Sequence, residues 1–349
     1  DLWLPALSTL AILYYLAGII LRNNKTWGNM MRTSALVLGS AISIAALLLT
    51  KENSGWYVLV MGILFIAEMY LYKNGWLEAA IPTFFTLGVF LILRDFNVVR
   101  ASYHLLAYSL IWILADLSAH LTFSSPRPLS LLIRFIGGIL AITNYSLLLT
   151  ETDPGIAAFG FGLYTLLFLT VSLLYRQPNL LYTFTLTLPL FVIFLFRLFD
   201  VTQWIHPVIV VAVLFYAAGF ILRRRQRAAK WDVVLLQSGL GVGVIVSIAA
   251  LILGGLDASI PVAVAATLWA VEAYEKKNAW LAFPANGLYL LAYFIILFEL
   301  NVNEPQFFSI GTALFGLIQH YLLTRAESKT GTFIMGMFSQ FILLGTTYI

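Results

Sequence analysis

The chain has 349 residues, of which 61% are hydrophobic and 10% are charged, and its formal net charge is +4. Soluble domains carry about 25% charged residues, so this composition excludes a water-soluble globular fold and indicates a protein embedded in lipid. Cysteine is absent, which excludes disulfides, thiolate metal sites and cysteine nucleophiles.

Apolar runs of bilayer-spanning length follow one another along the whole chain. A spanning helix needs about 20 apolar residues. Polar residues divide the sequence into fourteen such runs, at 3–21, 34–50, 55–72, 77–93, 102–121, 129–149, 155–175, 180–198, 206–222, 233–254, 258–275, 280–298, 306–324 and 331–349. Helices satisfy their own backbone hydrogen bonds in hydrocarbon, so we predict an all-α polytopic bundle of about 14 transmembrane helices.

Basic residues gather in every second link between these runs. Links after odd-numbered runs hold fifteen of the 20 Lys and Arg residues, whereas acidic residues favour the opposite links. Basic loops face the cytoplasm in membrane proteins. The sequence therefore predicts a plasma (inner) membrane protein with a cytoplasmic Arg223–Lys230 link and its N-terminal residue outside.

The chain also repeats itself. A shift of 204 residues places Ser43–Leu47 on Ser247–Leu251 and Glu68 on Glu272, and it also aligns several Asn, Lys and Trp residues. A weaker half-period lies near 103. Units of about 102 and 204 residues hold four and eight helices, which are even numbers, so we predict parallel internal repeats.

We divide the sequence into three regions of one continuous membrane domain. Residues 1–125 hold the first five predicted helices, 126–230 form a weaker intermediate repeat, and 231–349 repeat the first region. The chain begins with Asp1 and ends inside an apolar run, so we expect it to be a slice of a longer chain.

A stripe of small residues marks the second helix of each eight-helix copy. Small residues four positions apart let two helix backbones approach closely in lipid. We predict a helix-packing seam made of Ala35, Gly39, Ser43, Gly239, Gly243 and Ser247. A phosphate-binding glycine loop needs a strand before it, which an apolar helix does not supply.

Three prolines lie in the predicted cytoplasmic halves of apolar runs: Pro82, Pro189 and Pro284. A proline inside a helix removes one backbone hydrogen bond and can kink the helix. Each proline is a candidate kink, with two readings: a broken helix beside a substrate site, or a bend accommodated by neighbouring helices. Asn286, close to Pro284, adds a polar group to the first reading.

Glu68 and Glu272 each lie inside an apolar run, about five residues from a basic link. A carboxylate at this depth is costly unless it is paired, hydrated or protonated. One hypothesis is a proton- or cation-handling site used once per copy. The other is a carboxylate that binds a tyrosine or lysine, such as Lys276 four residues after Glu272, and joins two helices.

A second polar group combines Asp116 and His120 on one predicted helix with Arg134 on the next. The link between them is short, so we predict an ion pair between Asp116 and Arg134. Two side chains are too few for a metal site, and His320 occupies the place of Asp116 in the other copy. No motif implies a cofactor, a metal or a catalytic residue.

These features favour transport or handling of a small or amphipathic, lipid-like molecule through a path between parallel repeats. The alternative is a non-catalytic scaffold subunit of a larger membrane complex. A third hypothesis, an intramembrane transferase, needs a longer surface loop, so an enzyme is not favoured. The expected partners are the lipid bilayer and other copies or membrane subunits, and we expect no nucleic acid.

Overall fold

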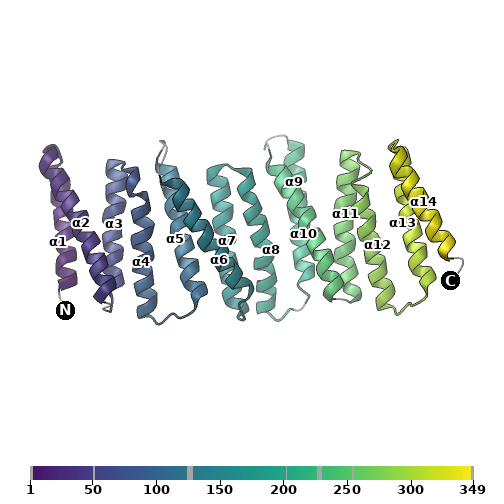
Figure 1. Ribbon diagram of the computed structural model, residues 1–349, viewed down its shortest axis with the longest axis horizontal. Helices are drawn as coiled ribbons and strands as arrows, with labels where there is room; N and C mark the ends of the chain where they lie inside the picture. The colour runs from purple at the N-terminus through teal and green to yellow at the C-terminus, as the bar shows by residue number, and fades with distance from the viewer. Residues whose placement is uncertain are drawn as a thin grey trace. The chain divides into compact units, whose positions relative to one another are not determined.

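The computed structural model describes residues 3–49, 52–123, 129–201, 203–225, 230–253 and 255–346. Over these residues the chain forms fourteen α-helices and four short 3₁₀ helices, without a strand (Figure 1). The predicted all-α class and helix count are confirmed. Asp1 and residues 226–229 of the Arg223–Lys230 link lie outside the described residues.

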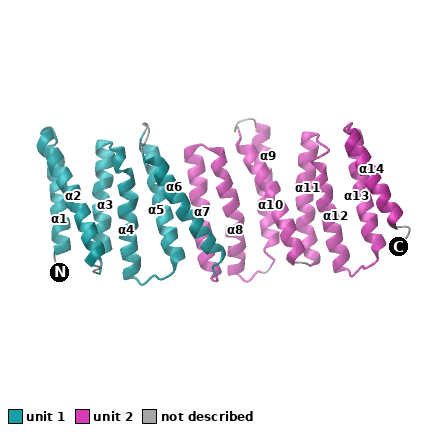
Figure 2. Cartoon of the chain, in the orientation of Figure 1, with its two compact units in different colours: residues 1–151 teal, residues 152–349 magenta. Residues whose placement is uncertain are grey.

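The helices belong to two compact units, residues 1–151 and 152–349 (Figure 2). Unit 1 contains α1 (Trp3–Ile20), α2 (Lys25–Leu49), α3 (Ser54–Tyr72), α4 (Ala80–Asp95), α5 (Ala101–Thr122) and α6 (Ser130–Leu149). Unit 2 contains α7 (Pro154–Tyr175), α8 (Leu181–Leu198), α9 (Ile205–Arg225), α10 (Trp231–Leu253), α11 (Ser259–Lys276), α12 (Ala282–Glu299), α13 (Pro305–Arg325) and α14 (Lys329–Thr346). The division into 1–125, 126–230 and 231–349 concerns the sequence repeat and stays a prediction.

Thirteen of the described helices are long and apolar enough to cross a membrane. This finding indicates a multi-pass protein embedded in a membrane. Helix α14 is the exception, because Lys329, Gln340 and several Thr, Gly and Ser residues dilute its apolar content.

The helices are apolar on their outer faces as well as in their packed faces. In α2, Ala35 and Ala46 are fully buried, whereas Val37 and Leu48 are 70% and 74% exposed. A helix that is hydrophobic all round is suited to a core or a membrane, and here the exposed side has hydrocarbon as its solvent.

Within each unit, the principal helix contacts join helices that are one or two positions apart along the chain. Consecutive helices pair as hairpins, such as α1 with α2 and α9 with α10 (Figure 1). A third helix then packs on both members, α3 on α1 and α2, and α11 on α9 and α10. Each of these groups contains a buried cluster, which extends to Leu91 of α4 in unit 1 and to Ala292 and Ile295 of α12 in unit 2.

Helix α2 begins at Lys25, well before the apolar run predicted at 34–50. Its first turns are polar, and hydropathy therefore assigns them to a link. The helix nevertheless continues through them, because polar residues can remain helical beyond the hydrocarbon core. This extension turns Arg32 from an expected link residue into a buried residue on a helix.

Several helices end in the same way, with a non-glycine residue in the left-handed region. After α4, α8 and α12 this residue is Asn97, Asp200 or Asn301, with φ of 53°, 57° and 55°. The next residue in each case is a valine, whose N–H donates to a carbonyl five residues earlier at 2.9–3.0 Å. This hydrogen bond satisfies a carbonyl that the end of the helix leaves unpaired. After α3, α7 and α11, the left-handed residues are Lys73, Arg176 and Lys277.

Candidate functional site

In unit 1, Glu68 of α3 binds residues from both helices that pack against it. Its Oε2 accepts a hydrogen bond from the Tyr15 hydroxyl of α1 at 3.1 Å and from Arg32 Nη1 of α2 at 3.4 Å. The Arg32 guanidinium carbon also lies 3.2 Å from the centre of the Tyr72 ring. Arg32 and Glu68 are only 7% and 9% exposed, so two opposite charges neutralise each other inside the helix group.

In unit 2, Glu272 of α11 is held by a similar set of groups. Its Oε2 accepts a hydrogen bond from the Tyr216 hydroxyl of α9 at 2.9 Å. Arg223 Nη2, at the end of α9, lies 3.1 Å from Oε1, and Lys276 Nζ lies 2.8 Å from the same oxygen. Glu272 is 2% exposed, so its carboxylate is enclosed by three polar partners.

Each of the two carboxylates binds a tyrosine of its own unit, but the cation comes from a different helix in each unit. A Cβ atom added to Gly18 would lie 2.5 Å from Arg32 Cγ. A Cβ atom added to Gly219 would lie 2.8 Å from Leu236 Cγ. Arg32 and Leu236 therefore occupy the same place against the preceding helix. Unit 2 has leucine where unit 1 has its cation, and the positive charge comes instead from the ends of α9 and α11.

An open groove lies beside Glu272. The groove has a volume of about 420 Å³, and its lining includes Arg223, Asp232, Leu236, Gln237 and Lys276. Its charged groups are already paired, since Arg223 and Lys276 both contact Glu272. The groove therefore offers few unused charges for a ligand.

The small-residue seam brings helix backbones together in both units. In unit 1, Ala35 is fully buried, a Cβ on Gly39 would lie 3.2 Å from Met61 of α3, and Ser43 donates to the Gly39 carbonyl at 2.9 Å. These contacts fill the interface between α2 and its neighbours. They are consistent with a packing role.

In unit 2 the closest approach within the seam is at Gly239, which takes the place of Ala35. A Cβ on Gly239 would lie 2.7 Å from the Ala212 carbonyl oxygen of α9, and one on Gly243 would lie 3.2 Å from Ala265 of α11. Ser247 donates to the Gly243 carbonyl at 2.8 Å. The α10 backbone therefore touches the α9 backbone at a point where only hydrogen fits.

Asp116 and Arg134 form the predicted ion pair, with Arg134 Nε 2.9 Å from Asp116 Oδ2. The pair joins α5 to α6, as expected from their short link. His120 is exposed on α5, whereas His320 bonds the Thr332 carbonyl at 2.8 Å and joins α13 to α14. Across the described part of the chain, no group of three His, Asp or Glu side chains could hold a metal ion.

The candidate kinks differ in their position along the helices. Pro82 and Pro284 are the third residues of α4 and α12, in a first turn where backbone N–H groups lack an intrahelical acceptor. Proline is tolerated there, so neither residue requires a broken helix. Pro189 alone among the three lies inside its helix, α8.

Asn286 and Gln319 form a polar pair between α12 and α13. Asn286 Nδ2 donates to Gln319 Oε1 at 2.9 Å, and Gln319 Nε2 donates to the Ala279 carbonyl at 2.9 Å. Gln319 is fully buried. Sequence reasoning overlooked Gln319, although an amide inside an apolar run is a signal that could have revealed it. It also overlooked Arg32 as the partner of Glu68.

Comparison with known proteins adds no relative to this description. A scan against models of protein families finds no match, and a search of curated proteins finds none.

Proposed function

We propose that this protein is an integral membrane scaffold: a non-catalytic series of helix hairpins that supports a larger membrane assembly. The main support is the state of Glu68 and Glu272. Each carboxylate is buried and bound to a tyrosine and at least one cation from its own unit. We call these groups the carboxylate clamps: Tyr15, Arg32 and Glu68 in unit 1, and Tyr216, Arg223, Glu272 and Lys276 in unit 2. The hydrogen bonds and ion pairs of these clamps hold neighbouring helices of one unit together.

A parallel repeat of eight helices is part of this proposal. Three kinds of local structure support it: the clamp glutamates, the serines of the packing seam, and the left-handed residues after α4 and α12 all recur 204 positions apart. The residue after α8, Asp200, lies 103 positions after Asn97 and supports the weaker half-period. Copies separated by an even number of helices enter the membrane in the same direction.

Transport is less well supported by the geometry. A transported ion or polar solute needs exchangeable polar groups along its path. In the described residues, the clamp carboxylates are occupied, and the principal helix contacts within each unit run between near neighbours. A transferase would need a surface segment with reactive groups, and a metal-dependent one is not supported, since no group of three His, Asp or Glu side chains among the described residues could hold a metal ion.

The clamps can be tested for transport directly. We expect vesicles containing the native chain, or the Glu68→Gln, Glu272→Gln double variant, to be no more permeable to protons and cations than protein-free vesicles. A fluorescent pH or cation indicator inside the vesicles measures this permeability. Flux in the native chain that disappears in the double variant would reject the scaffold proposal.

A scaffold must also contact other proteins through its lipid-exposed faces. A photo-crosslinker in place of Ile245, which is 59% exposed on α10, should give discrete protein adducts in native membranes. The control places it at Val246, which is fully buried. Lipid adducts alone at position 245, and at other exposed positions of both units, would count against the proposal.

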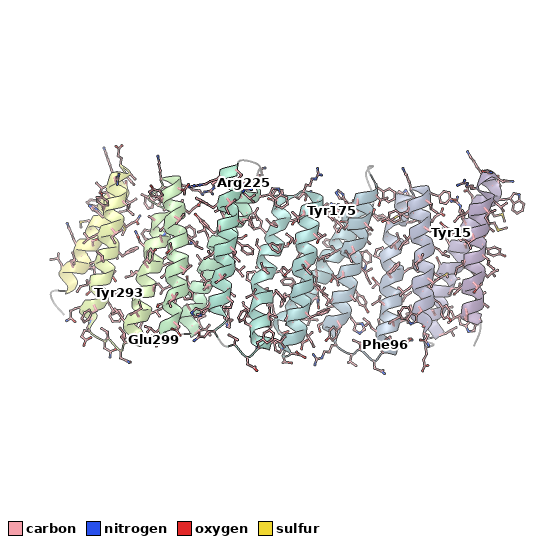
Figure 3. All side chains as sticks on the ribbon, turned by 180° about the vertical axis from the view of Figure 1, so that it is seen from behind. Tyr15, Phe96, Tyr175, Arg225, Tyr293 and Glu299 are labelled. Atoms are coloured by element: carbon pink, nitrogen blue, oxygen red, sulfur yellow. The ribbon has the colours of Figure 1, made fainter. Side chains whose placement is uncertain are left out.

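We also propose that the basic helix ends face the cytoplasm. Arg225 and Glu299 lie at opposite ends of the unit 2 helices (Figure 3). Because the native chain lacks cysteine, single cysteines report orientation cleanly. We expect Glu304→Cys to react with an impermeant maleimide in intact cells, and Arg225→Cys to react only after the membrane is opened. The reverse pattern would invert the orientation.

A further inference from the structure

The interface between α12 and α13 contains an apolar groove of about 370 Å³. Its walls include Tyr289 and Tyr293 of α12 and Leu314 and Ile318 of α13. Tyr289, Leu314 and Ile318 are 42–55% exposed, so the groove opens on the outer flank of unit 2. Both helices are long and apolar enough to span a membrane, which makes hydrocarbon the surrounding solvent.

Two local features distinguish the two sides of this groove from the corresponding interface of unit 1. A Cβ on Gly311 would lie 2.5 Å from the Tyr293 ring, so that ring packs directly on the α13 backbone at the Tyr293 end of the groove. In unit 1, Trp112 bridges α5 to Thr86 of α4 with a 3.0 Å hydrogen bond. The position 204 residues after Trp112 is Gly316, which supplies no such bridge.

The other end of the groove is polar. The Ala279 carbonyl can only accept a hydrogen bond, so Gln319 must present its Nε2 to it and its Oε1 to Asn286. Asn286 therefore donates with Nδ2 and leaves Oδ1 as an acceptor. No other described residue donates to this oxygen, and Asn286 lines the groove.

The position of this acceptor suits an amphipathic ligand. Asn286 is the fifth residue of α12, about 6 Å from the helix start and so near the headgroup region. Tyr293 lies toward the opposite end of the helix, nearer Glu299 (Figure 3). From Asn286 to Tyr293 the groove follows about 10 Å of helix with apolar walls.

From this arrangement we propose that the α12–α13 groove binds a membrane lipid with a hydroxyl group next to its acyl chain. The chain lies between Leu314 and the Tyr289–Tyr293 face, and the hydroxyl donates to Asn286 Oδ1. A monoacylglycerol or diacylglycerol has this chemistry. The site is independent of the carboxylate clamps and adds a specific lipid to the proposed scaffold.

The test uses two photoactivatable lipids that differ in their donor. The native chain is reconstituted in phosphatidylcholine vesicles with a diazirine-bearing monoacylglycerol, or with the methyl ester of the same acyl chain. After irradiation, adducts are mapped by peptide mass spectrometry. We expect adducts concentrated on the groove residues, with the monoacylglycerol labelling about three- to tenfold more than the ester, the ratio that one hydrogen bond supplies.

Three variants separate the polar and apolar contributions. Asn286→Leu should make the two probes label equally. Leu314→Trp should fill the groove and lower labelling of the groove residues by both probes severalfold, because the indole takes the space of the acyl chain. Leu317→Trp is the matched control, since Leu317 is 45% exposed on the same helix but does not line the groove. It should label as the native chain does, and it shows that a new tryptophan on α13 is tolerated.

Three results would overturn the proposal. Equal labelling of the native chain by both probes would show that the lipid hydroxyl does not contribute to binding. Adducts spread evenly over the exposed faces of α12 and α13 would show that the groove is not a specific lipid site. Crosslinks from groove residues to a second copy or another protein, in place of lipid, would assign this face to a protein interface.

Discussion

Arg32→Leu should destabilise unit 1 by about 3–5 kcal/mol, because it leaves the buried Glu68 carboxylate without its cation. Both side chains are about nine-tenths buried, so solvent screens the lost attraction poorly. Tyr15 would remain a hydrogen-bond donor, but it carries no charge. Unfolding in mixed micelles of increasing denaturing detergent, followed by circular dichroism, measures the change.

Unit 2 indicates how this loss can be repaired. It has Leu236 in the place of Arg32 and Lys276 four residues after its glutamate, where unit 1 has Tyr72. We therefore expect Tyr72→Lys, added to Arg32→Leu, to recover about 1–3 kcal/mol through a new pair with Glu68. Tyr72→Lys alone, with Arg32 still present, should not stabilise the chain. Strictly additive effects of the two substitutions would show that charge neutralisation is not what holds this clamp together.

Gly239→Ala should destabilise unit 2 by about 1–3 kcal/mol, because the new Cβ would meet backbone atoms of α9 that cannot turn aside. It would lie 2.7 Å from the Ala212 oxygen and 2.8 Å from the Tyr216 nitrogen. The two helices would have to separate, and Tyr216 would move relative to Glu272. The same detergent titration measures the loss.

Gly241→Ala is the matched control on the same helix. Apart from the backbone of its own helix and its chain neighbours, no described atom lies within 4 Å of a Cβ at Gly241. The alanine should therefore leave stability unchanged or raise it by up to about 1 kcal/mol, the usual helix preference for alanine over glycine. If both variants behaved alike, the close approach of α9 and α10 would not be the reason for glycine at position 239.

The carboxylate clamps explain why charged residues persist in helices that are otherwise apolar. Removing one partner leaves an isolated charge in a poorly polar setting, whereas the complete clamp is neutral. Glu68 has one cation and Glu272 has two, yet both glutamates keep a tyrosine from the first helix of their group. The cation can come from a different helix in each unit, because only its charge and its distance from the carboxylate matter.

Hydropathy alone predicted most of the fold. Helical class, helix number and most boundaries follow from the length of each apolar run, since the bilayer imposes one length on every crossing. The start of α2 was placed about nine residues late, because Lys25 and Arg32 interrupt the apolar pattern but not the helix. The polar residues Glu68, Glu272, Asp116 and Arg134 were found because they stand out in apolar surroundings.

The sequence by itself determined that this chain is helical and membrane-embedded, since those properties depend on composition and on spacing along the chain. Only the tertiary structure decided which groups meet: Arg32 with Glu68, Arg223 with Glu272, and Gln319 with Asn286. Such pairings depend on the rotation of each helix and on its closest neighbour. Both are set by side-chain packing between helices, which a one-dimensional pattern of apolar residues does not contain.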